Sequence, residues 1–135
     1  MSDALARLDN VDWAALRHAY GAAGDVPGML RGLHRPEKAA AAADDLLTHV
    51  HHQGGAVHSS APAALGYVIA AAADPAIDAD VRQELLDLVG ALADAANSAA
   101  PRFVTSAWPA AWDLAVTDPV AAAGRSAGGA PYRRR

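Results

Sequence analysis

Apolar residues recur at intervals of three and four positions in five separate stretches of this chain, and no stretch carries the alternation typical of β-strands. This period places apolar side chains on one face of an α-helix, which must be buried against another element. The expected helices cover roughly residues 12–20, 25–33, 36–52, 60–73 and 80–97, and a short sixth covers 108–116. The sequence therefore predicts an all-α domain.

The expected helix boundaries are marked by residues with known end preferences. Asp12 and Asp25 are candidate N-caps, and Asp80 with Gln83 resembles a capping box. Gly21 is expected to stop the first helix because glycine readily ends a helical turn.

Two of the expected helix pairs, 25–52 and 60–97, match in kind and order. Pro27 aligns with Pro62 and Leu30 with Leu65, which gives a repeat of about forty residues made of a short and a longer helix. Such units bury their apolar faces by stacking on a neighbour. We predict stacked helical hairpins in a HEAT-like α-solenoid of about two repeats plus an N-terminal helix. A compact four- or five-helix bundle is the alternative.

The length of 135 residues suits one domain. We assign residues 1–118 to a single helical-repeat domain. Residues 119–135 contain glycine, arginine and no helical periodicity toward their end, so we expect a flexible C-terminal tail.

Charge is distributed unevenly along the chain. Residues 1–124 hold seven Lys and Arg against fifteen Asp and Glu. An acidic body disfavours phosphate backbones and favours a basic protein, so we expect a protein partner and no nucleic acid. No apolar run approaches the ~20 residues that span a membrane, and no signal-peptide core is visible, which predicts a cytoplasmic protein with no membrane contact. The absence of cysteine excludes disulfide and thiolate chemistry.

Several short runs in the first half of the chain resemble small bacterial HEAT-repeat-like proteins. They are Asp12-Trp13, Leu16-Arg17-His18-Ala19-Tyr20-Gly21, Asp25-Val26-Pro27 and His52-Gln53-Gly54, within about residues 11–72. The resemblance implies the α-solenoid fold and a scaffold or partner-binding role without a reaction. HEAT-like proteins also occur as immunity partners of bacterial toxins. The chain departs from the pattern at Gly55-Ala56-Val57, where a bulkier, aromatic-bearing stretch is usual.

Four histidines, His49, His51, His52 and His58, lie within ten positions. Histidine with carboxylate suits zinc, iron or nickel, but His49 and His52 share a helical face from which His51 points away. Histidine is also favoured at a helix C-terminus by the helix dipole. We predict no metal, no cofactor and no catalytic residue. A metal-dependent or accessory enzyme that uses the His49/His52 region is the alternative.

Charged residues flank the apolar stripes of the two longer helices. In stacked hairpins the second helices line a common concave surface, so these flanks would meet in an acidic groove. The predicted partner-binding residues are Asp45, His49, His52, Asp80, Glu84, Asp87 and Asp94. We therefore expect a non-enzymatic binding module or scaffold for a basic protein, or, as an alternative, an immunity protein that neutralises a basic bacterial toxin.

Overall fold

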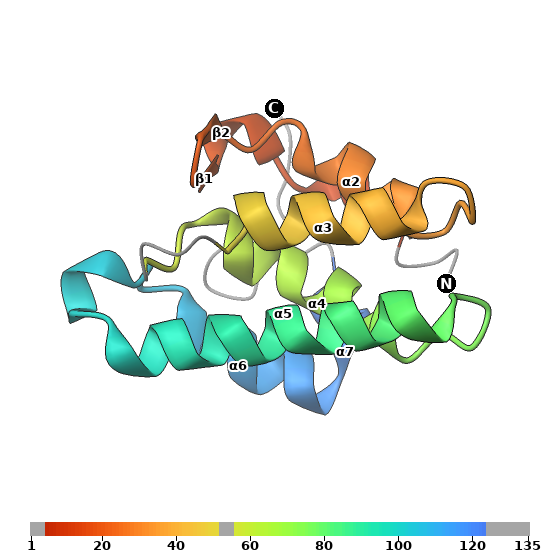
Figure 1. The fold of residues 1–135 in the computed structure, drawn as a ribbon. Helices are drawn as coiled ribbons and strands as arrows, with labels where there is room; N and C mark the ends of the chain where they lie inside the picture. Colours follow the sequence, from red (N-terminus) through yellow and green to blue (C-terminus); the bar gives the residue numbers. More distant parts are fainter. Residues whose placement is uncertain (1–4, 52–55, 124–135) are drawn as a thin grey trace.

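The computed structural model describes residues 5–51 and 56–123, which are largely helical (Figure 1). In these ranges the α-helices are α2 (Val26–Gly32), α3 (Ala39–His49), α4 (Ser60–Ala72), α5 (Ala79–Ser98), α6 (Trp108–Thr117) and α7 (Pro119–Ala122). The strands β1 (Arg17–His18) and β2 (Gly21–Ala22) pair antiparallel, and 3-10 turns cover Leu8–Asn10, Trp13–Ala15 and Pro101–Phe103. The predicted all-α class is confirmed.

Helix α4 lies at the centre of the packed chain. It contacts α2, α5, α6 and α7, and its residues from Ala63 to Val68 are all buried. A helix that is apolar nearly all round, as this one is, can only be accommodated inside a core. Tyr67 is its largest buried side chain, and its ring centroid lies 6.2 Å from that of Trp13.

The α2–α3 pair packs on the α4–α5 pair so that the first helices of the two pairs are in contact and the second helices are in contact. Helix α2 contacts α4, and α3 lies beside α5 with both helices running in the same direction (Figure 1). This adjacency is the one that stacked helical hairpins require. Two pairs are too few to define a superhelix, so the α-solenoid stays a prediction.

The prediction of an α-helix over residues 12–20 is wrong. The chain instead makes the 3-10 turn Trp13–Ala15 and then the β1–β2 hairpin, in which Gly21 adopts a φ of 134° that favours glycine. The Ala19 backbone N–H donates to the carbonyl of His49 at 2.9 Å and so completes the C-terminal end of α3. Tertiary hydrogen bonds of this kind override a local helical pattern and cannot be read from the spacing of apolar residues.

The remaining boundaries differ from expectation by a few residues. Helix α3 begins at Ala39 and not at residue 36, and α5 is capped by Asp78, whose carboxylate accepts the Asp80 backbone N–H at 3.2 Å. The predicted capping box on Asp80 and Gln83 is therefore wrong, because the N-cap of α5 lies two positions earlier. The short helix over 108–116 is confirmed as α6.

Residues 119–123, which the sequence analysis assigned to the tail, belong to the packed part of the chain. Asp118 caps α7 by accepting the Ala121 backbone N–H at 3.1 Å, and Ala122 and Ala123 are buried. Helix α7 packs against α4 at Gly66, where a Cβ would meet the backbone nitrogen of Ala123 at 2.7 Å and the backbone oxygen of Pro119 at 2.8 Å. The folded unit thus extends to Ala123, and residues 124–135 lie outside the described ranges.

Candidate protein-binding face

Helices α3 and α5 meet along a line that carries three carboxylates, Asp44, Glu84 and Asp87, which we call the acidic seam. Glu84 is partly buried, Asp44 and Asp87 are exposed, and both act electrostatically on Glu84. Each helix turns its apolar stripe toward the core, through Leu46 on α3 and Leu85 and Leu88 on α5, and this fixes the seam at the outer edge of both stripes.

Like charges at the seam are not compensated within the described chain. Burial, together with the nearby Asp44 and Asp87 carboxylates, raises the pKa of Glu84 above its ordinary value of 4.5. In residues 5–51 and 56–123 the Arg–carboxylate ion pairs are Arg31–Asp9 and Arg35–Glu37, and the His18 and His34 imidazoles lie 2.8 and 3.9 Å from the Asp25 and Asp74 carboxylates. None of these side chains neutralises a carboxylate of the acidic seam, so all three carboxylates would attract an incoming cation.

The other predicted residues of α5 flank this seam. Asp80 and Asp94 are both exposed, one in the first turn of the helix and the other in the last third. Gln83 donates from its side-chain amide to the Asp87 carboxylate at 3.1 Å. Asp80, Glu84, Asp87 and Asp94 thus lie along one edge of α5, with Glu84 partly buried and the other three exposed, as the helical spacing predicts.

The predicted residues of α3 do not face α5. Asp45 lines a hollow of about 350 Å³ between α2 and α3, together with Asp25 and Lys38, and His49 lies against the hairpin residue His18. Asp44 is the carboxylate on the α5 side. Helical spacing defines the two flanks of α3 but not which neighbour each flank meets, and the flank with Asp45 and His49 faces α2 and the hairpin. His52 lies outside the described residues.

The packing of α2 on α3 explains why Asp45 lies away from α5. A helical hairpin needs contact between its own two helices, and α2 approaches α3 on the flank that carries Ala42. Gly32 of α2 sits so near Ala42 that a Cβ on the glycine would meet the alanine Cβ at 3.1 Å. Asp45 follows Ala42 by three positions on that flank, which leaves Asp44 for the other side.

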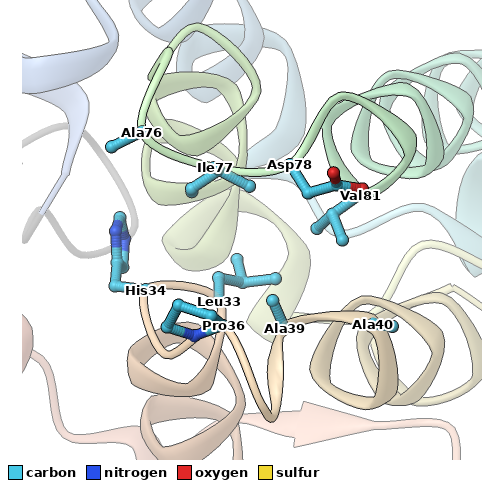
Figure 2. Close-up of a pocket in the computed structure, with 9 residues that line it drawn as sticks. All are labelled: Leu33, His34, Pro36, Ala39, Ala40, Ala76, Ile77, Asp78 and Val81. Atoms are coloured by element: carbon cyan, nitrogen blue, oxygen red, sulfur yellow. The ribbon is translucent and has the colours of Figure 1, made fainter.

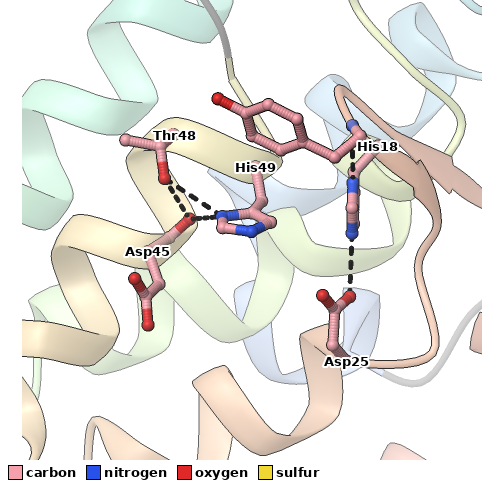
Figure 3. A network of polar contacts seen from close by, with 6 residues as sticks. His18, Asp25, Asp45, Thr48 and His49 are labelled. Atoms are coloured by element: carbon pink, nitrogen blue, oxygen red, sulfur yellow. Dashed lines mark hydrogen bonds and ion pairs between the residues drawn. The ribbon is translucent and has the colours of Figure 1, made fainter.

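The two histidines near the hairpin make local hydrogen bonds (Figure 3). The Tyr20 backbone N–H donates to His18 Nδ1 at 3.0 Å, so Nε2 carries the proton and donates to the Asp25 carboxylate at 2.8 Å. His49 Nδ1 lies 2.7 Å from the Asp45 carbonyl oxygen, which can only accept, so this nitrogen is the protonated one. The His18–Asp25 bond ties the hairpin to the start of α2, and the His49 bond lies within α3; the hairpin meets the end of α3 through the Ala19–His49 backbone bond and the His18–His49 ring contact.

The acidic seam leads at one end to a pocket of about 500 Å³ that the sequence analysis did not predict (Figure 2). It lies between the turn joining α2 to α3 and the turn joining α4 to α5. Its lining is mostly apolar, from Leu33, Pro36, Ala39, Ala40, Ala76, Ile77 and Val81. His34 and Asp78 stand at opposite sides of it (Figure 2).

His34 connects the two turns that frame this pocket. Its Nδ1 lies 3.9 Å from the Asp74 carboxylate across the gap. Burial lowers the pKa of His34 below 6.5 and outweighs Asp74, which raises it. At neutral pH the pocket therefore presents a neutral imidazole on one side and the Asp78 carboxylate on the other.

No three His, Asp or Glu residues in the described ranges converge in a way that could hold a metal ion. Over the same residues, none of the helices combines the length and apolar character needed to cross a bilayer. Comparison of the chain with known protein families, with characterised proteins and with solved structures gave no match. The similarity to HEAT-repeat-like proteins thus rests on the residues quoted above and stays a prediction.

Proposed function

We propose that this chain is a non-enzymatic protein-binding module and that its partner presents basic side chains to the acidic seam. The observation that carries the proposal is the grouping of Asp44, Glu84 and Asp87 without an ion pair where α3 and α5 meet. Packed like charges destabilise the free protein slightly, and a partner that brings Lys or Arg relieves that repulsion.

The overall charge supports a basic protein over other partners. Eight excess negative charges in residues 1–124 disfavour approach to a phosphate backbone and accelerate encounter with a positively charged protein. The proposed site lies on two packed helices, and rigid helices keep the carboxylates in fixed positions before binding. A scaffold of this kind needs no cofactor.

A bacterial toxin with a basic active surface would be one such partner, and the chain would then act as its immunity protein. In that case the acidic seam would cover the basic residues that the toxin uses on its own substrate. A metal-dependent or accessory enzyme at His49 and His52 remains a prediction from the sequence, because His52 lies outside the described residues.

The proposal is tested by site-specific photo-crosslinking in cells that produce the protein. A photoreactive residue replaces exposed Gln83 beside the seam, and the matched control carries it at exposed Ala110 on α6. We expect one basic protein to crosslink at position 83 and not at position 110, and we expect Glu84→Lys with Asp87→Lys to abolish that product. Equal products at both positions, or a product that survives charge reversal, would contradict the proposal.

A further inference from the structure

The apolar pocket and the acidic seam form one continuous surface. Ala40 and Val81 line the pocket, and one turn further along the same two helices stand Asp44 and Glu84. The pocket volume of about 500 Å³ falls within the range of pockets that bind compact ligands. Its rim is closed on the α5 side by the Asp78 carboxylate, which pairs with no described Lys or Arg.

We propose that this pocket anchors one apolar side chain of an extended partner segment, whose basic residues two and four positions away reach the acidic seam. This inference rests on the proposed function and adds the form of the recognised segment. An apolar group in the pocket supplies binding free energy by leaving water, and the flanking carboxylates select for neighbouring cations.

The spacing follows from helix and strand geometry. Counted from the middle of the turn between Asp78 and Val81, Glu84 stands about 7 Å and Asp87 about 11 Å further along α5, at ~1.5 Å per residue. In an extended peptide the side chains two and four positions from the anchor point the same way, at about 7 and 13 Å. Arg or Lys side chains are long enough to absorb the remaining difference of about 2 Å.

Charge decides which occupant fits this surface. A wholly apolar segment would leave the carboxylates at Asp78 and Glu84 beside its backbone without a cation, and an acidic segment would be repelled by them. A segment with an apolar residue followed by alternate basic residues satisfies both parts of the surface. His34, neutral at neutral pH, adds no repulsion toward the incoming cations.

The inference is tested with three blocked peptides and the full chain, by titration calorimetry at low salt. The first peptide is acetyl-Leu-Gly-Arg-Gly-Arg-amide. The second replaces Leu by Gly, and the third replaces both Arg by Gln. Because a buried leucine contributes ~1.5 kcal/mol or more, we expect the second peptide to bind about 10-fold more weakly than the first. The third should also bind more weakly, with less dependence on salt.

Chain variants separate the pocket from the seam. Ala40→Leu fills the pocket from an exposed helical position, and we expect it to remove the advantage of the leucine peptide while leaving the glycine peptide unaffected. Ala110→Leu, on α6, is the matched control and should change neither. Glu84→Lys with Asp87→Lys should weaken both peptides.

Equal affinity of the leucine and glycine peptides, with both weakened by charge reversal, would overturn the anchor and leave the proposed function standing. Loss of the leucine advantage in Ala110→Leu would likewise overturn the anchor. If charge reversal changes no affinity, or if no peptide binds, both the anchor and the acidic binding face are refuted.

Discussion

Replacing Gly66 by alanine tests the packing of the C-terminal helix on α4. An added Cβ would lie 2.7 Å from the Ala123 nitrogen, 2.8 Å from the Pro119 oxygen and 2.9 Å from the Ala122 Cβ. The first two contacts are with backbone, which cannot rotate away, so α7 must shift. Overpacking of this kind costs about 1–3 kcal/mol, against a gain of about 0.5–1 kcal/mol for alanine over glycine in a helix. We expect Gly66→Ala to lower the free energy of unfolding by about 1–2 kcal/mol.

Gly90 provides the matched control, because it also lies inside a helix but a Cβ there meets nothing within 4 Å. Gly90→Ala should raise the free energy of unfolding by about 0.5–1 kcal/mol, so the two variants should shift stability in opposite directions. Urea denaturation followed by circular dichroism measures both. If Gly66→Ala stabilises the protein as Gly90→Ala does, the close packing of α7 on α4 is refuted.

The side chains of Tyr67, His34 and Glu84 each give a measurable change on substitution or titration. The Tyr67 hydroxyl is buried without a hydrogen-bond partner among the described residues, and its pKa is raised to about 12, chiefly by burial. Tyr67→Phe should therefore leave the free energy of unfolding, measured by urea denaturation, unchanged or higher. A clear loss of stability would mean that the hydroxyl is hydrogen-bonded. Because the pKa of His34 is lowered below 6.5, the unfolded chain binds the proton more readily. The free energy of unfolding should fall as pH drops from 6.5 toward the pKa of His34 in the folded chain, and it should fall less in His34→Gln. Asp74→Asn should lower the pKa of His34 further, as measured by NMR. The pKa of Glu84 is raised above 4.5, and part of the cause is the nearby Asp44 carboxylate. Asp44→Asn should therefore move this pKa back toward 4.5 in an NMR titration of the Glu84 carboxyl group. An unchanged pKa would show that Asp44 does not face Glu84.

The long helices could be predicted from the sequence because each buries one face, and a buried helical face requires apolar residues every three or four positions. In α5, Val81, Leu85, Leu88 and Leu92 are all buried, as their spacing requires. The hairpin at residues 17–22 could not be predicted in the same way. Each strand has two residues, too few to alternate, and the hairpin is held by contacts with residues distant in sequence, such as the bond from Ala19 to His49.

The predicted site residues of α5 lie along one edge of that helix, whereas those of α3 that the structure describes lie away from α5. Periodicity places Glu84 and Asp87 on one edge of α5, and the structure keeps them there beside Asp44. Which edge of α3 faces α5 depends on how two hairpins stack, and no local pattern encodes that choice. The pocket between the two turns was missed for the same reason, since Leu33 and Ile77 are far apart in sequence and meet only after the pairs have packed.

The rate at which the crosslinked partner associates with the full chain, measured against ionic strength, shows whether the partner binds at the acidic seam. The partner is the protein captured at position 83, and the chain is compared with Glu84→Lys/Asp87→Lys and with Asp113→Lys, a control at an exposed carboxylate of α6. We predict that the double variant slows association by about 10-fold at low salt and flattens the salt dependence, whereas Asp113→Lys changes the rate much less. Equal rates and equal salt slopes in the native chain and the double variant would contradict binding at the acidic seam.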